Sequence, residues 1–248
     1  IMEELPGRSL AWSLECNPPE EPAALVQSAT LALARLHNYG RTKLANGSRI
    51  GPISDDSILA AMSGMGSGAS LEGCASPVEF FFHHMQWDLR RLRDWGICSA
   101  AAIRAWEQCL SDMRIPSSPL IYLHGDPSLR NFLHDGAGVT GIIDGGAIVG
   151  WPEVDLAAFM VFLCQISTAC TTHAQPLTFA DVMHDYISRS SYTIGDPLLL
   201  ETLMLRKIVS RLVTTVRINP GSRSLPILRN LATHCVEHSV FERVKIAM

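Results

Sequence analysis

Residues 122–136 read YLHGDPSLRNFLHDG, and this stretch decides which fold the sequence predicts. The segments around it have the apolar spacing of helices. In contrast, PLIYLHGD, NFLHD and VTGIID, all within residues 119–144, are short runs rich in β-forming residues. We therefore expect a mainly α protein with a small β-hairpin region, in the α+β class.

The expected hairpin brings distant polar residues together. If residues 131–134 form a strand, 135–138 a turn and 139–143 the returning strand, Asp144 comes back close to Asn131. Neighbouring strands lie about 5 Å apart, so the two side chains are expected to be near neighbours. Asp126 precedes this hairpin on the loop that leaves the first strand. Three oxygen-bearing side chains can therefore converge on one small volume.

The chemistry of Asp126, Asn131 and Asp144 suits phosphoryl transfer. Carboxylate and amide oxygens are hard ligands of the kind that Mg²⁺ prefers. In a phosphoryl transfer site, one aspartate can orient the acceptor hydroxyl and accept its proton while the other oxygens hold the metal. The alternative is that these are ordinary turn residues, because Asp and Asn favour turns. That alternative fits each residue alone better than it fits the ordered set.

Composition limits the classes of protein that the chain can represent. Its 248 residues are 47% hydrophobic, which suits a folded globular protein, and its net charge of -4 gives no basic field for nucleic acid. The seven cysteines form no CxxC pair, as expected for reduced thiols in the cytoplasm. The longest apolar run, residues 156–166, is too short for a membrane span and is expected to be a buried helix.

The remaining segments are predicted to be mostly helical. Expected helices span residues 20–37 (ending before Gly40), 76–96 and about 99–113, and two more begin near Thr178 and Asp196. Residues 40–76 contain a Gly- and Ser-rich stretch typical of a flexible linker. In the last helix we expect Arg206, Lys207 and Arg211 on the solvated face, and we expect Trp87, Trp95 and Trp106 to be packed.

Several motifs in order resemble one family of enzymes. HGDPSLRN at 124–131, IID ending at Asp144 and GWPEVDLA at 150–157 resemble the aminoglycoside phosphotransferase and choline kinase family, which has a protein-kinase-like fold. That family has an HGDxxxxN catalytic loop, then a metal-binding Asp and then a GxPxxDLA segment. The likeness starts with IMEELPGRSL at residues 1–10, which resembles the hinge between the two lobes, and continues to about residue 157.

The resemblance implies a domain organisation. Residues 1–10 would be the hinge, and residues 11–248 the helical C-terminal lobe carrying the catalytic loop at 122–155. The chain begins at Ile1 and contains no Gly-rich phosphate cover and no β-strand lysine, so we expect that the N-terminal β-rich lobe is absent and that nucleotide binding is weakened.

The resemblance also implies roles for individual residues. Asp126 would be the catalytic base, and Asn131 and Asp144 would bind Mg²⁺. His124 and Asp155 would support the catalytic loop.

The nucleotide, ATP, would contact a further set of residues in such a fold. Glu3 and Leu5 of the hinge would lie near the adenine, and Leu133 and Ile143 would form the floor of the pocket. The family often has an aromatic residue and an acid after the metal-binding Asp, whereas this chain has Gly145 and Gly146, which predicts a more flexible segment.

These observations favour an ATP-dependent phosphotransferase, a small-molecule kinase that transfers a γ-phosphate to a substrate hydroxyl. The alternatives are a kinase-like binding module without catalysis and, ranked last, a metal-dependent phosphohydrolase. The sequence predicts a small-molecule partner, with no nucleic acid and no membrane. It does not identify the acceptor.

Overall fold

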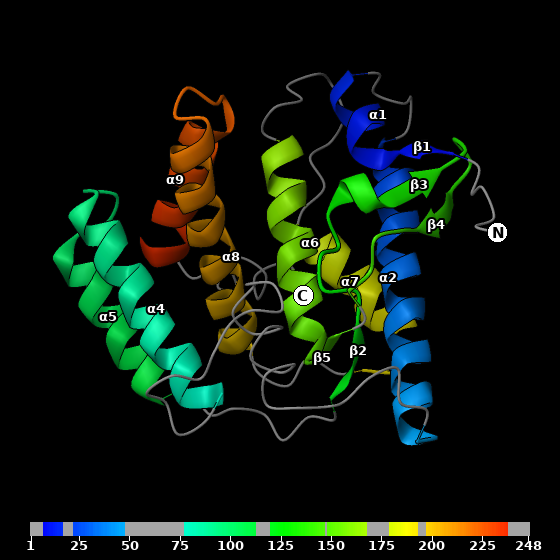
Figure 1. The fold of residues 1–248 in the computed structure, drawn as a ribbon, viewed down its shortest axis with the longest axis horizontal. Helices are drawn as coiled ribbons and strands as arrows, with labels where there is room; N and C mark the ends of the chain where they lie inside the picture. Colours follow the sequence, from blue (N-terminus) through cyan, green and yellow to red (C-terminus); the bar gives the residue numbers. More distant parts are fainter. Residues whose placement is uncertain are drawn as a thin grey trace.

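The fold was analysed on a computed structural model, which describes residues 7–16, 22–47, 77–112, 120–146, 148–167, 179–192 and 197–237. Helices form most of this part of the chain, and the strands are short (Figure 1). The prediction of a mainly α protein with a small β-hairpin region is therefore confirmed. The helices are α1 (Leu10–Cys16), α2 (Pro22–Ala45), α4 (Pro77–Asp94), α5 (Ala100–Asp112), α6 (Pro152–Ser167), α7 (Phe179–Arg189), α8 (Pro197–Ile218) and α9 (Ser224–Glu237).

Helix α6 forms the centre of the core. It packs against α8 and also contacts α1, α9 and β2 (Ile121–Leu123). Figure 1 shows it between α8 and α2. Leu156, Phe159 and Met160 are at most 1% exposed, as expected for a helix that is apolar on all sides. This confirms the prediction of a buried helix at residues 156–166.

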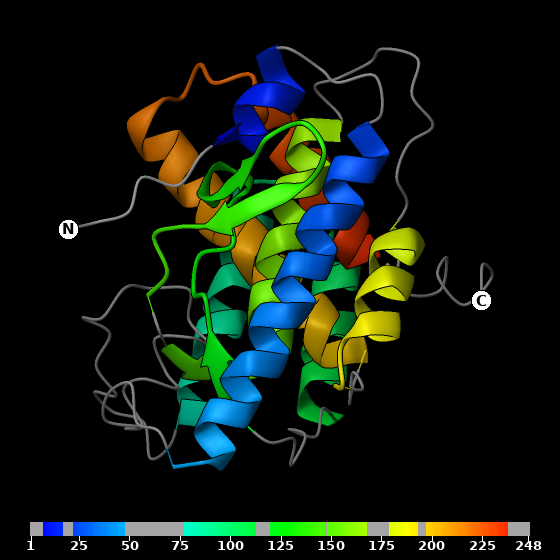
Figure 2. The ribbon, with the colours of Figure 1, turned by 90° about the vertical axis from the view of Figure 1, so that its right-hand side faces the viewer.

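The predicted hairpin is present, but each strand is one residue shorter than expected: Asn131 ends a 3-10 helix (Leu129–Asn131), and Ile143 follows the second strand. Strands β3 (Phe132–His134) and β4 (Val139–Ile142) pair antiparallel, with Phe132 opposite Ile142. In the turn, the carboxylate of Asp135 accepts the backbone N–H groups of Ala137 and Gly138. The short β1 (Arg8–Ser9) pairs with the other side of β3. This three-stranded sheet lies beside α2 (Figure 2).

A second sheet was predicted only in part. Its first strand is β2, and its partner is β5 (Ile148–Gly150), with Tyr122 opposite Val149. The β5 segment was not expected to be a strand because three residues that end in a glycine carry too little pattern to identify one. The pairing matters because it places the loop after β2 next to the start of α6.

The expectation that the first long helix ends before Gly40 is wrong. Helix α2 continues to Ala45, and Gly40 lies inside it, buried against β2. A Cβ atom at Gly40 would lie 2.4 Å from the backbone oxygen of Tyr122. A residue without a side chain is therefore needed at position 40 because the helix packs closely on the strand. Gly40 does not end the helix.

Replacing Gly40 with alanine is expected to destabilise the protein. Alanine favours the helix, but the helix would have to move away from the Tyr122 carbonyl, and such overpacking costs about 1–3 kcal/mol. Urea unfolding measures the decrease in the free energy of unfolding. Gly221→Ala is the matched control, because its Cβ would make only an ordinary contact, 3.8 Å from the side chain of Asn219. Equal stability of the two variants would contradict the close approach.

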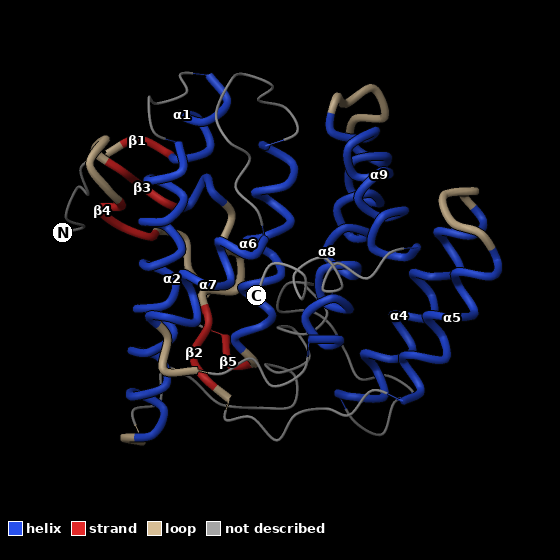
Figure 3. The backbone as a smooth tube through the Cα atoms, turned by 180° about the vertical axis from the view of Figure 1, so that it is seen from behind, coloured by secondary structure: helices blue, strands red, loops and turns tan. Residues whose placement is uncertain are grey.

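Two expectations about surface residues are also wrong. Arg206 is 7% exposed and pairs with the buried carboxylate of Asp88, so α8 carries this arginine into the contact with α4. Trp87 and Trp95 are 55% and 40% exposed, whereas Trp106 is buried as expected. The pair α4 and α5 lies outside α8 and α9 (Figure 3), so α4 presents one face to solvent. An amphipathic pattern does not show which neighbour each face meets.

Candidate functional site

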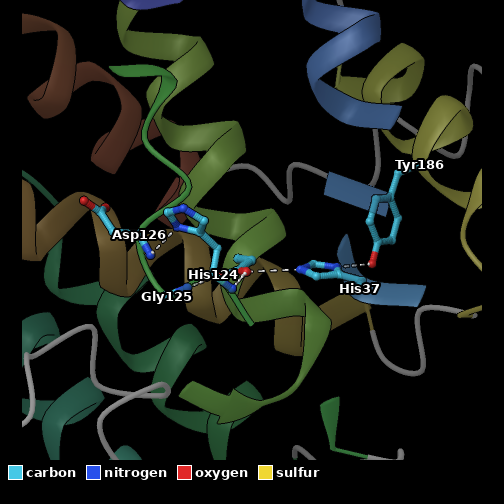
Figure 4. A network of polar contacts seen from close by, with 6 residues as sticks. His37, His124, Gly125, Asp126 and Tyr186 are labelled. Atoms are coloured by element: carbon cyan, nitrogen blue, oxygen red, sulfur yellow. Dashed lines mark hydrogen bonds and ion pairs between the residues drawn. The ribbon is translucent and has the colours of Figure 1, made fainter. Parts of the chain in front are cut away.

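The carboxylate of Asp155 holds the backbone of the loop that follows β2. Asp155 lies in the first turn of α6 and is fully buried. Its two oxygens accept the backbone N–H groups of His124, at 2.7 Å, and Gly125, at 2.9 Å. His37 Nε2 lies 3.1 Å from the same carboxylate, and its Nδ1 lies 2.6 Å from the hydroxyl of Tyr186. This chain of contacts links α7, α2 and α6 to the loop (Figure 4).

His124 joins the loop to the end of the hairpin. Its Nε2 donates to the backbone oxygen of Ile143, at 2.8 Å, and its Nδ1 accepts the backbone N–H of Asp126, at 3.3 Å. These two bonds require a neutral ring with its proton on Nε2. The backbone oxygen of His124 also accepts the N–H of Gly146, at 2.7 Å. Both ring nitrogens of His124 are therefore occupied by bonds that connect the loop to the end of the hairpin.

The carboxylate of Asp126 is available for chemistry because its backbone is fixed and its side chain is exposed. The side chain is 56% exposed, and its Oδ1 lies 3.6 Å from the Nζ of Lys207. In Figure 4 it lies at the end of the network opposite Tyr186. The backbone oxygen of Asp126 accepts the side-chain N–H of Asn131, at 2.9 Å. That bond leaves the amide oxygen of Asn131 without a hydrogen-bond partner among the described residues.

Asp144 returns next to Asn131, as the hairpin predicted. The N–H of Ile143 donates to the backbone oxygen of Asn131, at 2.9 Å, which places Asp144 one residue beyond the paired position. Asp144 is exposed, and its side chain has no hydrogen bond or ion pair within the described residues. Its φ is 60°, in the left-handed region, which Asp tolerates better than most residues. Gly145 lies against the His124 ring.

The oxygens of Asn131 and Asp144 have the donor chemistry that Mg²⁺ prefers. Both are hard donors from one hairpin, and neither is occupied by a protein donor in the described structure. Within the described ranges, no three His, Cys, Asp or Glu side chains group as a metal site. If Asn131 and Asp144 bound Mg²⁺, the ion would keep several water or phosphate ligands, as it does in sites with few protein oxygens.

A cleft of about 430 Å³ opens beside Asp126 and Asn131. Lys207 and Arg211 of α8 line it, although the sequence predicted both on the solvated face. The side chain of Lys207 is only 18% exposed, and burial lowers its pKa while the Asp126 carboxylate opposes the shift. One turn of helix separates the two cations, so they share a face, but no sequence signal shows that this face meets the catalytic loop.

The residues expected at the nucleotide are described only in part. Leu133 on β3 is half-buried, and Ile143 is 38% exposed at the end of β4. Leu133 pairs with Gly141, and Ile143 directly follows the last residue of β4, so both lie at the same small sheet. Glu3 and Leu5 lie outside the described residues, as does most of the predicted linker between residues 40 and 76.

No described helix combines the length and the apolar character that a bilayer span requires.

Comparisons with known proteins identify the family of this chain. Among solved structures, a choline kinase from Cryptosporidium parvum Iowa II is similar to this chain, with 10% sequence identity and a TM-score of 0.49. The match covers 99% of this chain and 71% of the choline kinase chain. A search of curated proteins finds no match. The sequence profile described as the phosphotransferase enzyme family, APH, matches residues 1–171. That match spans more than half of the 248 residues and confirms the resemblance seen in the motifs, so the chain belongs to the phosphotransferase enzyme family.

Proposed function

We propose that this protein is an ATP-dependent small-molecule kinase that transfers the γ-phosphate to a substrate hydroxyl. The observation that carries the proposal is the position of Asp126. Its carboxylate is exposed at a cleft, while its backbone belongs to a loop held by the buried Asp155. A positioned carboxylate beside space for an acceptor is what phosphoryl transfer to an alcohol requires.

Asp126 acts as the base in the proposed reaction. Its carboxylate orients the acceptor hydroxyl and accepts the proton as the hydroxyl oxygen bonds to the γ-phosphorus. The bond from that phosphorus to the oxygen bridging to the β-phosphate breaks, and the nucleoside diphosphate leaves. Lys207 contacts the same carboxylate and holds it at the cleft. His124 and Asp155 do not touch the substrate, and they position the loop.

Asn131 and Asp144 would hold the magnesium ion. When bound, the ion neutralises negative charge on the phosphates. The bond from the Asn131 amide nitrogen to the Asp126 backbone turns the amide oxygen away from the loop and leaves it for the metal. The hairpin keeps Asp144 beside it.

The nucleotide is proposed to lie with its base against the hairpin and its phosphates toward Asn131 and Asp144. Leu133 and Ile143 would contact its base, together with Glu3 and Leu5 of the segment at residues 1–10. In this proposal residues 1–10 act as the hinge, and residues 11–248 form the helical lobe with the catalytic loop at 122–155. The partly exposed Ile143 side chain supports this arrangement, since a base would cover its apolar surface.

The proposal is tested by following transfer of labelled γ-phosphate from ATP or GTP to a panel of hydroxyl compounds, using the natural protein. Transfer to at least one compound is expected. Nucleotide binding without transfer to any acceptor would favour a binding module without catalysis. Two tightly held transition ions, with hydrolysis of a phosphate ester, would favour a phosphohydrolase.

Replacing Asp144 with asparagine is expected to raise the Mg²⁺ concentration needed for half-maximal activity by roughly 10-fold or more, since a charged ligand is lost. Mg²⁺ titrations at saturating nucleotide measure the change. Asp135→Asn is the matched control, at the other end of the same hairpin, where asparagine keeps an oxygen for the turn. An unchanged Mg²⁺ requirement in the Asp144 variant would contradict its role as a ligand.

A further inference from the structure

The cleft beside Asp126 carries more positive than negative charge. Among the described residues that line it, the cations are Lys207, Arg130, Arg211 and Arg223, and the carboxylates are those of Asp126 and Glu15. This balance is opposite to that of the whole chain, whose net charge is -4. A local excess of cations in an acidic protein raises the local concentration of anions.

Three of these cations are available to a ligand. Lys207 pairs with Asp126, but within the described ranges no carboxylate lies in ion-pair distance of Arg130, Arg211 or Arg223. Arg130 and Arg223 are exposed, and Arg211 is half-buried. An arginine presents several donors in a fixed fork, which matches a carboxylate or a phosphate better than a single point charge does.

The aromatic ring of Phe162 holds two cations in position. The Nζ of Lys207 lies 5.1 Å from the ring centroid, and the guanidinium carbon of Arg211 lies 5.0 Å from it. The Nη2 of Arg211 donates to the side-chain oxygen of Gln165, at 3.3 Å. These contacts from α6 order the Arg211 side chain before any ligand binds, which lowers the entropic cost of binding.

Arg211 combines a buried, unsatisfied donor with a position in the cleft lining. Its Nε is buried and has no hydrogen-bond partner among the described residues. Burial is the largest effect that lowers the pKa of Arg211, and repulsion from Arg130 adds to it. The Asp126 carboxylate offsets this repulsion only in part, because the pKa of Arg211 is still lowered. The excess of like charges therefore raises the free energy of the empty cleft, and a bound anion would reduce the repulsion.

We infer that the acceptor is an alcohol that carries an anionic group, a carboxylate or a phosphate, and that Arg211, Arg130 and Arg223 bind this group while Asp126 faces the hydroxyl. The inference rests on the proposed function and adds the class of the acceptor. A quaternary ammonium or polyamine acceptor would instead meet repulsion from the arginines.

The test first measures binding of acceptor candidates to the natural protein without nucleotide, by calorimetry. The probes are matched short aliphatic alcohols whose far end carries a carboxylate, a phosphate, a neutral amide or a quaternary ammonium group. Saturable binding of the carboxylate or the phosphate compound, with the amide and ammonium compounds weaker, is expected. The stronger of the two anions identifies the class. Preference for the amide or ammonium compound would overturn the inference.

Steady-state kinetics then follow with the preferred anionic acceptor. Arg211→Gln and Arg223→Gln are each expected to raise the KM for that acceptor roughly 10- to 100-fold, because each removes a charged donor. The KM for nucleotide should not change. Arg217→Gln on α8 and Arg229→Gln on α9 are the matched controls, since both are exposed and do not line the cleft. Arg211→Lys, which keeps the charge but not the fork, is expected to lie between wild type and Arg211→Gln.

The outcomes separate the inference from the proposed function. If Arg211→Gln and Arg223→Gln raise the KM for nucleotide and leave the KM for the acceptor unchanged, the arginines serve the phosphate donor. That result would overturn the inference. Transfer to neutral or cationic alcohols only would overturn the inference and leave the kinase proposal standing. Saturable binding of the anionic alcohol that is weakened in Arg211→Gln, with no transfer under any condition, would support the anion site and contradict the kinase proposal.

Discussion

Asp126→Asn is expected to lower the kcat of phosphate transfer by about 100- to 10,000-fold. Among the described residues, the carboxylates of Asp126 and Glu15 line the cleft, and that of Asp126 belongs to the loop held by Asp155. An amide at position 126 cannot accept the hydroxyl proton. The folded structure should not change, because the side chain is 56% exposed and its one ion pair is with Lys207. The KM for nucleotide should also stay near the wild-type value.

The measurement is single-turnover transfer of labelled phosphate, with thermal unfolding as a check of the fold. Asp94→Asn is the matched control, because this exposed aspartate lies at the end of α4 and its ion pair among the described residues is with the neighbouring Arg93. Its activity should equal that of wild type. If Asp126→Asn retains most of its kcat, the assignment of Asp126 as base is wrong.

Asp155→Ala is expected to lower the free energy of unfolding by about 3–5 kcal/mol. The change leaves the N–H groups of His124 and Gly125 without their acceptor and removes the partner of the His37 Nε2. Because these bonds fix the loop that carries Asp126, activity should fall even at temperatures where the variant is folded. Urea unfolding followed by circular dichroism measures the first effect, and kcat measures the second.

Tyr186→Phe is the matched comparison for Asp155→Ala. It removes one hydroxyl at the far end of the same network, 2.6 Å from His37, and leaves the loop bonded to Asp155. Loss of a single hydrogen bond costs about 0.5–1.5 kcal/mol. A cost for Asp155→Ala no larger than for Tyr186→Phe would contradict the central position of the carboxylate.

Local patterns determined the hairpin and the positions of most helices. Alternation and turn residues at 131–143 are enough to define two antiparallel strands, although the register shifts between Leu133 and His134. The start of α4 at Pro77 follows from capping residues, because a helix terminus is satisfied by side chains next to it in sequence. The meeting of Asp144 with Asn131 was therefore predictable.

Gly40 and Arg206 show that local sequence patterns do not reveal contacts with distant segments of the chain. Glycine often ends helices, yet Gly40 continues α2 because a strand from residues 121–123 packs against it. Arg206 follows the polar spacing of α8, yet it is buried against Asp88 of α4. In both cases the deciding contact comes from a segment about 80 or more residues away along the chain.

The sequence by itself determined the family, the hairpin and the ordered oxygens of Asp126, Asn131 and Asp144, because these depend on residues close together in the chain. Only the tertiary structure decided that α8 faces this site and that Lys207 and Arg211 line the cleft with Arg130 and Arg223. The physical reason is that an amphipathic helix specifies which residues share a face, while long-range packing decides what that face meets.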